Sequence, residues 1–139
     1  MHTSQRVDFL RRAALFAGLD DDDLGAVAAK LSGRSYVKGA AVFRAGDPGA
    51  SVFLLLRGKV AIRDDHRHLV HLVPGECFGE LAALTHDPRS ADAICEESCE
   101  LLELTSSHLL LLMSQSPELQ RQVMRVLVER VKEAGSRSQ

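Results

Sequence analysis

Residues 75–91 read GECFGELAALTHDPRSA, and this stretch interrupts a series of short strand-like segments. Gly79 permits an unusual backbone angle or the close approach of a ligand. Residues 80–84 can form one turn of helix, whose N-terminal N–H groups favour an anion. Arg89 then offers a planar fork suited to phosphate oxygens, and Ser90 adds a hydroxyl donor. These residue types in this order predict an anion-binding loop.

Glu80 is an unusual neighbour for a phosphate, because both groups are negatively charged. It fits the site if its carboxylate accepts a hydrogen bond from a sugar hydroxyl. The alternative is a surface helical turn in which Glu80 and Arg89 form an ordinary exposed ion pair, which contributes little to stability. Single residues favour this alternative, whereas the combination favours a site for a phosphate attached to a sugar.

The segments on either side of this loop have the sequence pattern of an all-β domain. Apolar and alternating segments recur between Gly or Pro turns, at Tyr36-Val37, Val42-Phe43, Val52 to Leu56, Val60 to Ile62, Leu69 to Val73, Ala91 to Ile94 and Leu101 to Leu104. Strands at intervals of about 8–12 residues predict a barrel or a sandwich.

Helical patterns precede the strands. Phe9, Ala13 and Phe16 have the spacing of one helix face, and Gly18 ends that pattern. The acidic run at residues 20–23 then suits the start of a second helix, where carboxylates cap free N–H groups and complement the helix dipole. Cation binding is the alternative, but the run lacks the Gly and the distant Glu of a calcium loop.

Helical patterns also follow the strands. Thr105 or Ser106 can cap a helix that runs through Met113, and Pro117 suits the start of another helix. The last helix is apolar on more than one face, at Leu119, Val123, Met124, Val126, Leu127, Val128 and Val131. A surface helix needs only one apolar stripe. The additional apolar side chains therefore predict that the β-roll, a ligand or a second chain packs against this helix.

These segments resemble a known family. Residues 78–82 (FGELA) and 88–91 (PRSA) look like the phosphate-binding cassette of cyclic nucleotide-binding domains, as in catabolite activators, kinase regulatory subunits and gated channels. Gly46-Asp47 with residues 52–60 (VFLLLRGKV) resembles the turn and the third and fourth strands of the family. Residues 15–19 (LFAGL) resemble its helical entry.

The resemblance covers about residues 8–133 and implies a fold that is mainly β with flanking helices. The expected architecture is an eight-stranded, jelly-roll-like β-roll over residues 34–104. N-terminal helices at 6–33 precede it and C-terminal lid helices at 105–134 follow it, so that residues 1–139 form a single domain.

The resemblance also implies six ligand-binding residues, namely Gly79, Glu80, Leu81, Ala82, Arg89 and Ser90. Arg89 would neutralise the cyclic phosphate, Ser90 would donate to it, and Glu80 would accept from the ribose 2′-hydroxyl. Backbone N–H groups of the cassette would supply further donors. Members with Ser after the Arg often take cyclic AMP, so cyclic AMP is favoured, with cyclic GMP as the alternative.

Two features of the expected site depend on the three-dimensional arrangement. Asp92 stands where the family often has an uncharged residue. It would weaken phosphate binding if it faced inward on the same side as Ser90, and it would be harmless if it turned outward. The last helix would cover the base, and Gln122 or Arg125 could then reach the base edge.

Composition limits the other function classes. The formal net charge is −2, with no basic excess to attract nucleic acid, and no apolar run is long enough to cross a membrane. Cys77, Cys95 and Cys99 form no C-x-x-C pair and indicate buried, reduced thiols in a cytoplasmic protein. We expect a non-enzymatic sensor without cofactor or metal. Its partner would be a second copy or an effector protein bound through the C-terminal helix, in this chain or a longer one.

Two alternatives remain at this point. One is a degenerate β-roll that serves as an interaction module and binds no nucleotide, which Asp92 would favour. The other is a cupin-like metalloenzyme, because His66, His68 and His71 lie close together in the sequence. The cupin pattern lacks its Glu, since Leu72 occupies that position.

Overall fold

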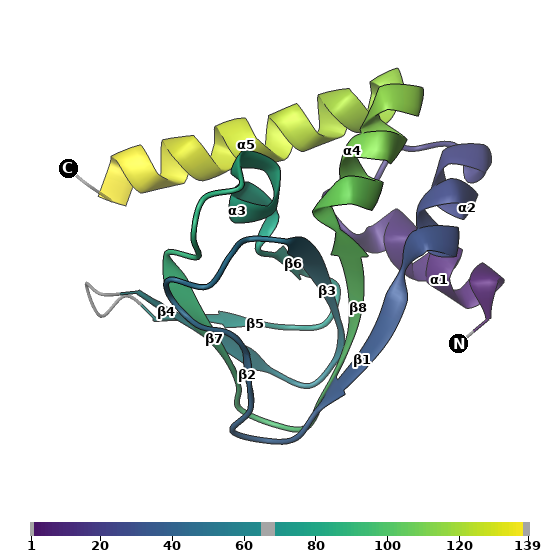
Figure 1. Cartoon of the computed structure of the whole chain (residues 1–139). Coiled ribbons are helices and arrows are strands. Elements are labelled where there is room, and N and C mark those ends of the chain that lie inside the picture. The colour runs from purple at the N-terminus through teal and green to yellow at the C-terminus, as the bar shows by residue number, and fades with distance from the viewer. Residues whose placement is uncertain (1, 65–68, 138–139) are drawn as a thin grey trace.

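The computed structural model describes residues 2–64 and 69–137, which form five helices and eight strands. In chain order these are α1 (Thr3–Arg12), α2 (Asp21–Lys30), β1 (Ser32–Tyr36), β2 (Ala41–Phe43), β3 (Ser51–Arg57), β4 (Val60–Asp64), β5 (Leu69–Leu72), β6 (Cys77–Phe78), α3 (Glu80–Thr85), β7 (Ala91–Cys95), β8 (Cys99–Thr105), α4 (Ser106–Gln115) and α5 (Pro117–Arg137). The strands curl into a roll, α5 crosses its upper edge, and α3 lies between α5 and the strands (Figure 1).

The roll consists of two antiparallel sheets of four strands, in the orders β1-β8-β3-β6 and β2-β7-β4-β5. This confirms the expected β-roll with flanking helices. The sequence pattern by itself shows seven strand segments and misses β6. Its two residues pair with Phe53 and Leu54 of β3, and a segment that short carries no periodicity to detect.

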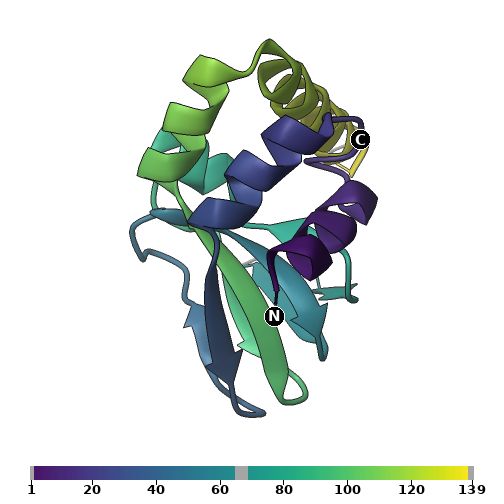
Figure 2. The same cartoon turned by 90° about the vertical axis from the view of Figure 1, so that its right-hand side faces the viewer.

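Strand β3 is buried on both faces. Phe53 and Leu55 pack inside the roll, whereas Val52 and Leu54 pack against the helices. Figure 2 shows α1, α2, α4 and α5 gathered at one end of the strands. Because side chains alternate across a strand, burial of both faces explains the uninterrupted apolar run of β3.

The N-terminal helix ends earlier than its apolar spacing predicts. α1 stops at Arg12, where Ala13 turns extended, so Phe16 lies beyond the helix. Phe16 is nevertheless fully buried in the helical core. Tertiary packing of this side chain thus replaces the expected helix face. The helical region also begins at Thr3 and β1 at Ser32, each earlier than the expected borders.

The predicted helix starts are confirmed. Asp20 accepts a hydrogen bond from the backbone N–H of Asp23 at 2.8 Å, and Thr105 accepts from that of His108 at 3.2 Å. Such caps contribute about 1 kcal/mol each. Pro117 is the first residue of α5.

In the parts of the chain that the structure describes, no three His, Cys, Asp or Glu side chains are grouped to hold a metal.

α5 is covered along only part of its surface. Leu119 and Val123 are buried in the helical core, whereas Met124 and Val128 are 64% and 50% exposed. The side chain of Val131 lies outside the described residues. None of the described helices is long and apolar enough to cross a bilayer.

All three cysteines are buried as free thiols. Burial, together with a hydrogen bond and charge interaction with the thiol of Cys99, raises the pKa of Cys95 to about 12. A thiol with so high a pKa stays protonated and unreactive near neutral pH, so Cys95 acts as a small apolar core residue.

Candidate functional site

The predicted anion loop folds as a strand, a turn and a short helix. β6 ends at Phe78, Gly79 adopts a left-handed φ of 80°, and α3 begins at Glu80. Glycine adopts this conformation without the steric cost of a side chain. A Cβ on Gly79 would lie only 2.6 Å from Nη1 of Arg89. Gly79 therefore permits both the turn and the close approach of the arginine.

The loop after α3 returns the chain to the β2–β3 turn. His86 ends the helix with a left-handed φ of 61°. Pro88 then pairs with Pro48 in an isolated β-bridge, and the backbone N–H of Arg89 donates to the carbonyl of Asp47 at 2.7 Å. These contacts position Arg89 at the start of β7, next to the turn that Gly79 makes.

A cavity of about 310 Å³ lies beside this turn. Its wall includes all six residues predicted from the sequence: Gly79, Glu80, Leu81, Ala82, Arg89 and Ser90. The rest of the wall is apolar or small, and comprises Phe43, Ile62, Val70, Leu72, Cys77, Phe78 and Ala91. One half of the cavity therefore offers charged and polar groups and the other an apolar surface, which suits a ligand with a phosphate and a flat base.

Arg89 is 5% exposed and is held by the roll. Nη1 donates to the carbonyl of Gly79 at 2.8 Å, and Nη2 donates to the carbonyl of Ser51 at 2.6 Å. The guanidinium lies 4.2 Å from the centre of the Phe43 ring. Nε is buried and has no hydrogen-bond partner among the described residues. A buried donor without a partner is costly.

The charge of Arg89 is set by two opposing effects. Burial lowers the pKa of the guanidinium, whereas the negative charges of Glu80, Asp47 and Glu103 raise it. Arginine starts from so high a pKa that it keeps its charge in this setting. Glu80 is itself 5% exposed and lines the same cavity. The site therefore combines a buried cation with a buried acidic side chain.

Asp92 faces away from the cavity. Ala91, Ala93 and Cys95 are the buried residues of the alternating strand β7, and Asp92 lies between the first two. Its carboxylate accepts a hydrogen bond from the backbone N–H of Ala45 at 2.8 Å. Ser90, just before β7, lines the cavity, whereas Asp92 does not. Asp92 thus stabilises the loop that contains Ala45.

The sequence missed several residues that contact or flank Arg89. Phe43 stacks near its guanidinium, Ser51 accepts from it, and Glu103 contributes charge. Glu103 lies within the apolar run of β8, where an acidic residue on the inward side is a detectable signal. Phe43 and Ser51 carried no comparable signal, because their proximity depends on the register of distant strands.

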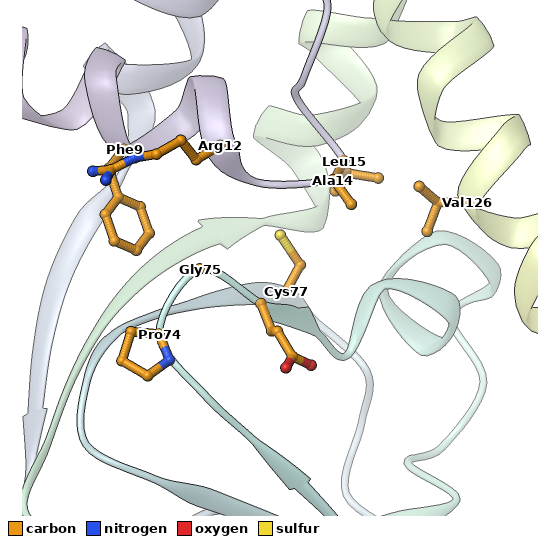
Figure 3. A pocket seen from close by; sticks show the side chains of 9 residues that line it. Phe9, Arg12, Ala14, Leu15, Pro74, Gly75, Cys77 and Val126 are labelled. Carbon is orange, nitrogen blue, oxygen red and sulfur yellow. The ribbon is translucent and has the colours of Figure 1, made fainter.

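A larger cavity of about 510 Å³ lies on the helical side of the roll. Phe9, Leu15, Pro74 and Val126 line it together with Arg12, and Figure 3 shows these side chains around it. None of the predicted ligand-binding residues takes part in its wall.

Gln122 also belongs to this helical side of the molecule. Its side-chain amide donates to the carbonyl of Ala17. No described residue of α5 lines the cavity of about 310 Å³. That Gln122 or Arg125 reaches the edge of a bound base therefore stays a prediction, which requires α5 to move.

The structure describes only one of the three clustered histidines, His71. His66 and His68 lie outside the described residues. His71 contacts Glu96, with 2.5 Å between Nδ1 and Oε1. An acidic neighbour of this kind suits an ordinary surface pair between β5 and the end of β7.

Comparison with known families now adds to the geometry. A family model described as "cyclic nucleotide-binding domain" matches residues 33–116. The cyclic AMP receptor protein of Thermus thermophilus is 32% identical over 130 residues, which is 90% of this chain and 60% of that protein.

Two solved structures are also similar. The catabolite activator protein of Thermus thermophilus superposes with a TM-score of 0.82 at 31% identity, over 90% of this chain and 61% of that one. The regulatory domain of Toxoplasma gondii PKA, solved with cAMP, gives a TM-score of 0.72 at 28% identity, over 79% of this chain and 44% of that one. This chain thus spans about 60% or less of the length of these relatives.

Proposed function

The chain belongs to the cyclic nucleotide-binding domain family, and we propose that it is a sensor that holds a cyclic nucleotide in the cassette cavity, with cyclic AMP favoured over cyclic GMP. Arg89 neutralises the cyclic phosphate and Ser90 donates to it. Glu80 accepts from the ribose 2′-hydroxyl, and backbone N–H groups of Gly79, Leu81 and Ala82 complete the cassette. The family consists of regulatory binding domains, so the domain is not an enzyme, and a cupin-like metalloenzyme has no support.

The observation that carries this proposal is the buried Arg89. A buried cation is costly unless an anion or hydrogen-bond acceptors compensate it. Two backbone carbonyls each accept one hydrogen bond from its terminal nitrogens, while Nε has no partner among the described residues and the side chain lines the cavity. A singly charged phosphate diester in the cavity would balance the charge of this side chain.

Asp92 no longer favours a degenerate domain that binds no nucleotide. Its carboxylate is hydrogen-bonded to the backbone of Ala45, outside the cavity. The repulsion that an inward-facing carboxylate would exert on a phosphate is therefore much reduced. The intact pair of Glu80 and Arg89 in one cavity supports nucleotide binding in its place.

The ligand class can be tested by competition against a fluorescent cyclic AMP analogue. We expect cyclic AMP to bind more tightly than linear AMP, because the cavity encloses a singly charged diester and a linear phosphate is larger and more highly charged. Equal affinity for the two would contradict the cassette assignment. Cyclic GMP in the same assay tests the base preference, and a clear preference for it would reverse that choice without affecting the fold.

The output of the sensor is proposed to be a movement of α5. Leu119 and Val123 anchor its first half in the helical core, and Gln122 ties it to Ala17. The exposed Met124 and Val128 follow in the next turns. Because these side chains are apolar, we expect the second half of α5 to pack against the nucleotide base, a second copy of the chain or an effector protein. A ligand shifts such an equilibrium only through unequal affinity for its two states.

Hydrogen exchange with and without cyclic AMP tests this movement. We expect slower exchange at residues 78–91, where the ligand binds, and at residues 118–131, where α5 gains a cover. Unchanged exchange at 118–131 alongside slower exchange at 78–91 would show that the ligand binds but that α5 is not the lid. The movement would then have to be sought in residues 9–31.

The cellular setting belongs to the same proposal. The buried free thiols of Cys77, Cys95 and Cys99 fit a reducing compartment, which supports a cytoplasmic location. The formal net charge of −2 supports a partner other than nucleic acid for this chain alone.

A further inference from the structure

Glu103 places a carboxylate on the inner face of the roll. It lies on β8 opposite Phe53 of β3, and both residues occupy inward positions. Its side chain is 17% exposed. Charged side chains are uncommon at such positions unless they have partners. Glu103 has two partners that come from different strands.

Both carboxylate oxygens of Glu103 accept hydrogen bonds. The hydroxyl of Ser51 donates to Oε2 at 2.6 Å, and Nε of Arg34 donates to Oε1 at 2.8 Å. The side chain of Arg34 is 56% exposed. The carboxylate is therefore fixed between a hydroxyl inside the roll and a cation at the surface.

Ser51 connects this carboxylate to the cassette arginine. Its hydroxyl donates to Glu103, while its carbonyl accepts from Nη2 of Arg89 at 2.6 Å. Arg89 and Glu103 also line a common cavity of about 330 Å³, together with Phe43, Asp47 and Ser51. Arg89 and Phe43 line the cavity of about 310 Å³ as well, so these two residues contribute to both walls.

The charges of the two groups support each other. Burial raises the pKa of Glu103, but hydrogen bonds from Ser51 and Arg34 and the positive charges of Arg34 and Arg89 outweigh it, so that the pKa is lowered overall. Glu103 in turn raises the pKa of Arg89. The carboxylate is thus ionised near neutral pH and attracts the same guanidinium that the cassette offers to an anion.

We propose that Glu103 is a positioning residue for Arg89. Through Ser51 it holds the guanidinium toward the cavity of about 330 Å³, and so competes with an anion in the cassette cavity of about 310 Å³. This rests on the proposed function, in which that anion is the cyclic phosphate. Arg34 moderates the competition from the surface, because it shares the negative charge of Glu103. Affinity for the nucleotide is then set partly by a group that does not touch it.

The test measures cyclic AMP affinity in Glu103→Gln, which keeps the shape of the side chain and removes its charge. We expect binding to tighten by about two- to tenfold. Glu100→Gln is the matched control, because Glu100 is an exposed acid on the same strand that pairs with Arg57 at 3.6 Å. It should bind like the parent. Weaker or unchanged binding in Glu103→Gln would overturn the proposal.

A double-mutant cycle removes the ambiguity of a general charge effect. Arg34→Ala alone should weaken binding by about twofold, since Glu103 then loses its surface partner. In the Arg34→Ala/Glu103→Gln variant this loss should vanish, because the two residues act through one carboxylate. An unchanged loss in the double variant would contradict the coupling. Arg34→Ala keeps the test decisive if Glu103→Gln does not fold, because Arg34 is largely exposed.

A second readout is independent of any nucleotide. The ¹⁵N–¹H signal of Arg89 Nε, assigned by its loss in Arg89→Lys, should shift in Glu103→Gln and not in Glu100→Gln. An unshifted signal would overturn the positioning role even where cyclic AMP binds. If the parent chain does not bind cyclic AMP but the signal shifts, the proposed function fails while the positioning of Arg89 by Glu103 stands.

Discussion

Replacing Arg89 with alanine is expected to weaken cyclic AMP binding by about 30-fold to several thousand-fold. The variant leaves a partly buried phosphate without its countercharge, and loss of one partner of such a pair costs on the order of 2–5 kcal/mol. At about 1.4 kcal/mol per factor of ten, this gives the stated range. Isothermal titration calorimetry of the parent and the variant measures the difference.

The variant should still fold, with a lower stability. The carbonyls of Gly79 and Ser51 lose their donor and Phe43 loses its packed guanidinium, which costs on the order of 1–3 kcal/mol. Circular dichroism therefore accompanies the titration. Arg44→Ala, which removes an exposed arginine at the end of β2, is the control for net charge and should bind normally. If Arg89→Ala bound like the parent while Glu80→Ala did not, the phosphate role of Arg89 would be wrong.

Gly79→Ala is expected to reduce affinity by tenfold or more, which corresponds to at least about 1.4 kcal/mol. Two effects combine in this variant. The left-handed φ of 80° disfavours any side chain, and the new Cβ would lie 2.6 Å from Nη1 of Arg89. Because Arg89 is held on its other side by Phe43 and Ser51, relief of the clash must displace the guanidinium or the start of α3. Both changes disturb the phosphate site.

Gly75→Ala separates these two effects. Gly75 has a left-handed φ of 100°, but a Cβ there would meet no atom within 4 Å. It therefore carries the backbone strain without the clash, and we expect a comparable loss of thermal stability with nearly unchanged affinity. Equal affinity in the two variants would show that the close approach of Gly79 and Arg89 is not needed for binding. Thermal denaturation and titration of both variants provide the comparison.

Features that depend on neighbouring residues could be predicted from the sequence. The cap at Thr105 involves a hydrogen bond to a residue three positions away, and the acidic cap at Asp20 is equally local. The cassette residues from Gly79 to Ser90 lie within one short segment, and the six that the family resemblance implied all line one cavity. The strand segments were visible where one face or both faces of a strand are buried over several residues.

Other features were decided only by tertiary packing. α1 ends at Arg12 because the residues that follow, including Phe16, are buried in a core shared with distant helices. Asp92 accepts from the N–H of Ala45, which is 47 residues away in the sequence. Glu103 and Ser51 meet Arg89 through the pairing of β3 with β8. A shift of one residue in that register would turn these side chains to the opposite face. Local sequence thus determined which chemical groups the cassette contains, whereas strand register determined which charges surround its arginine.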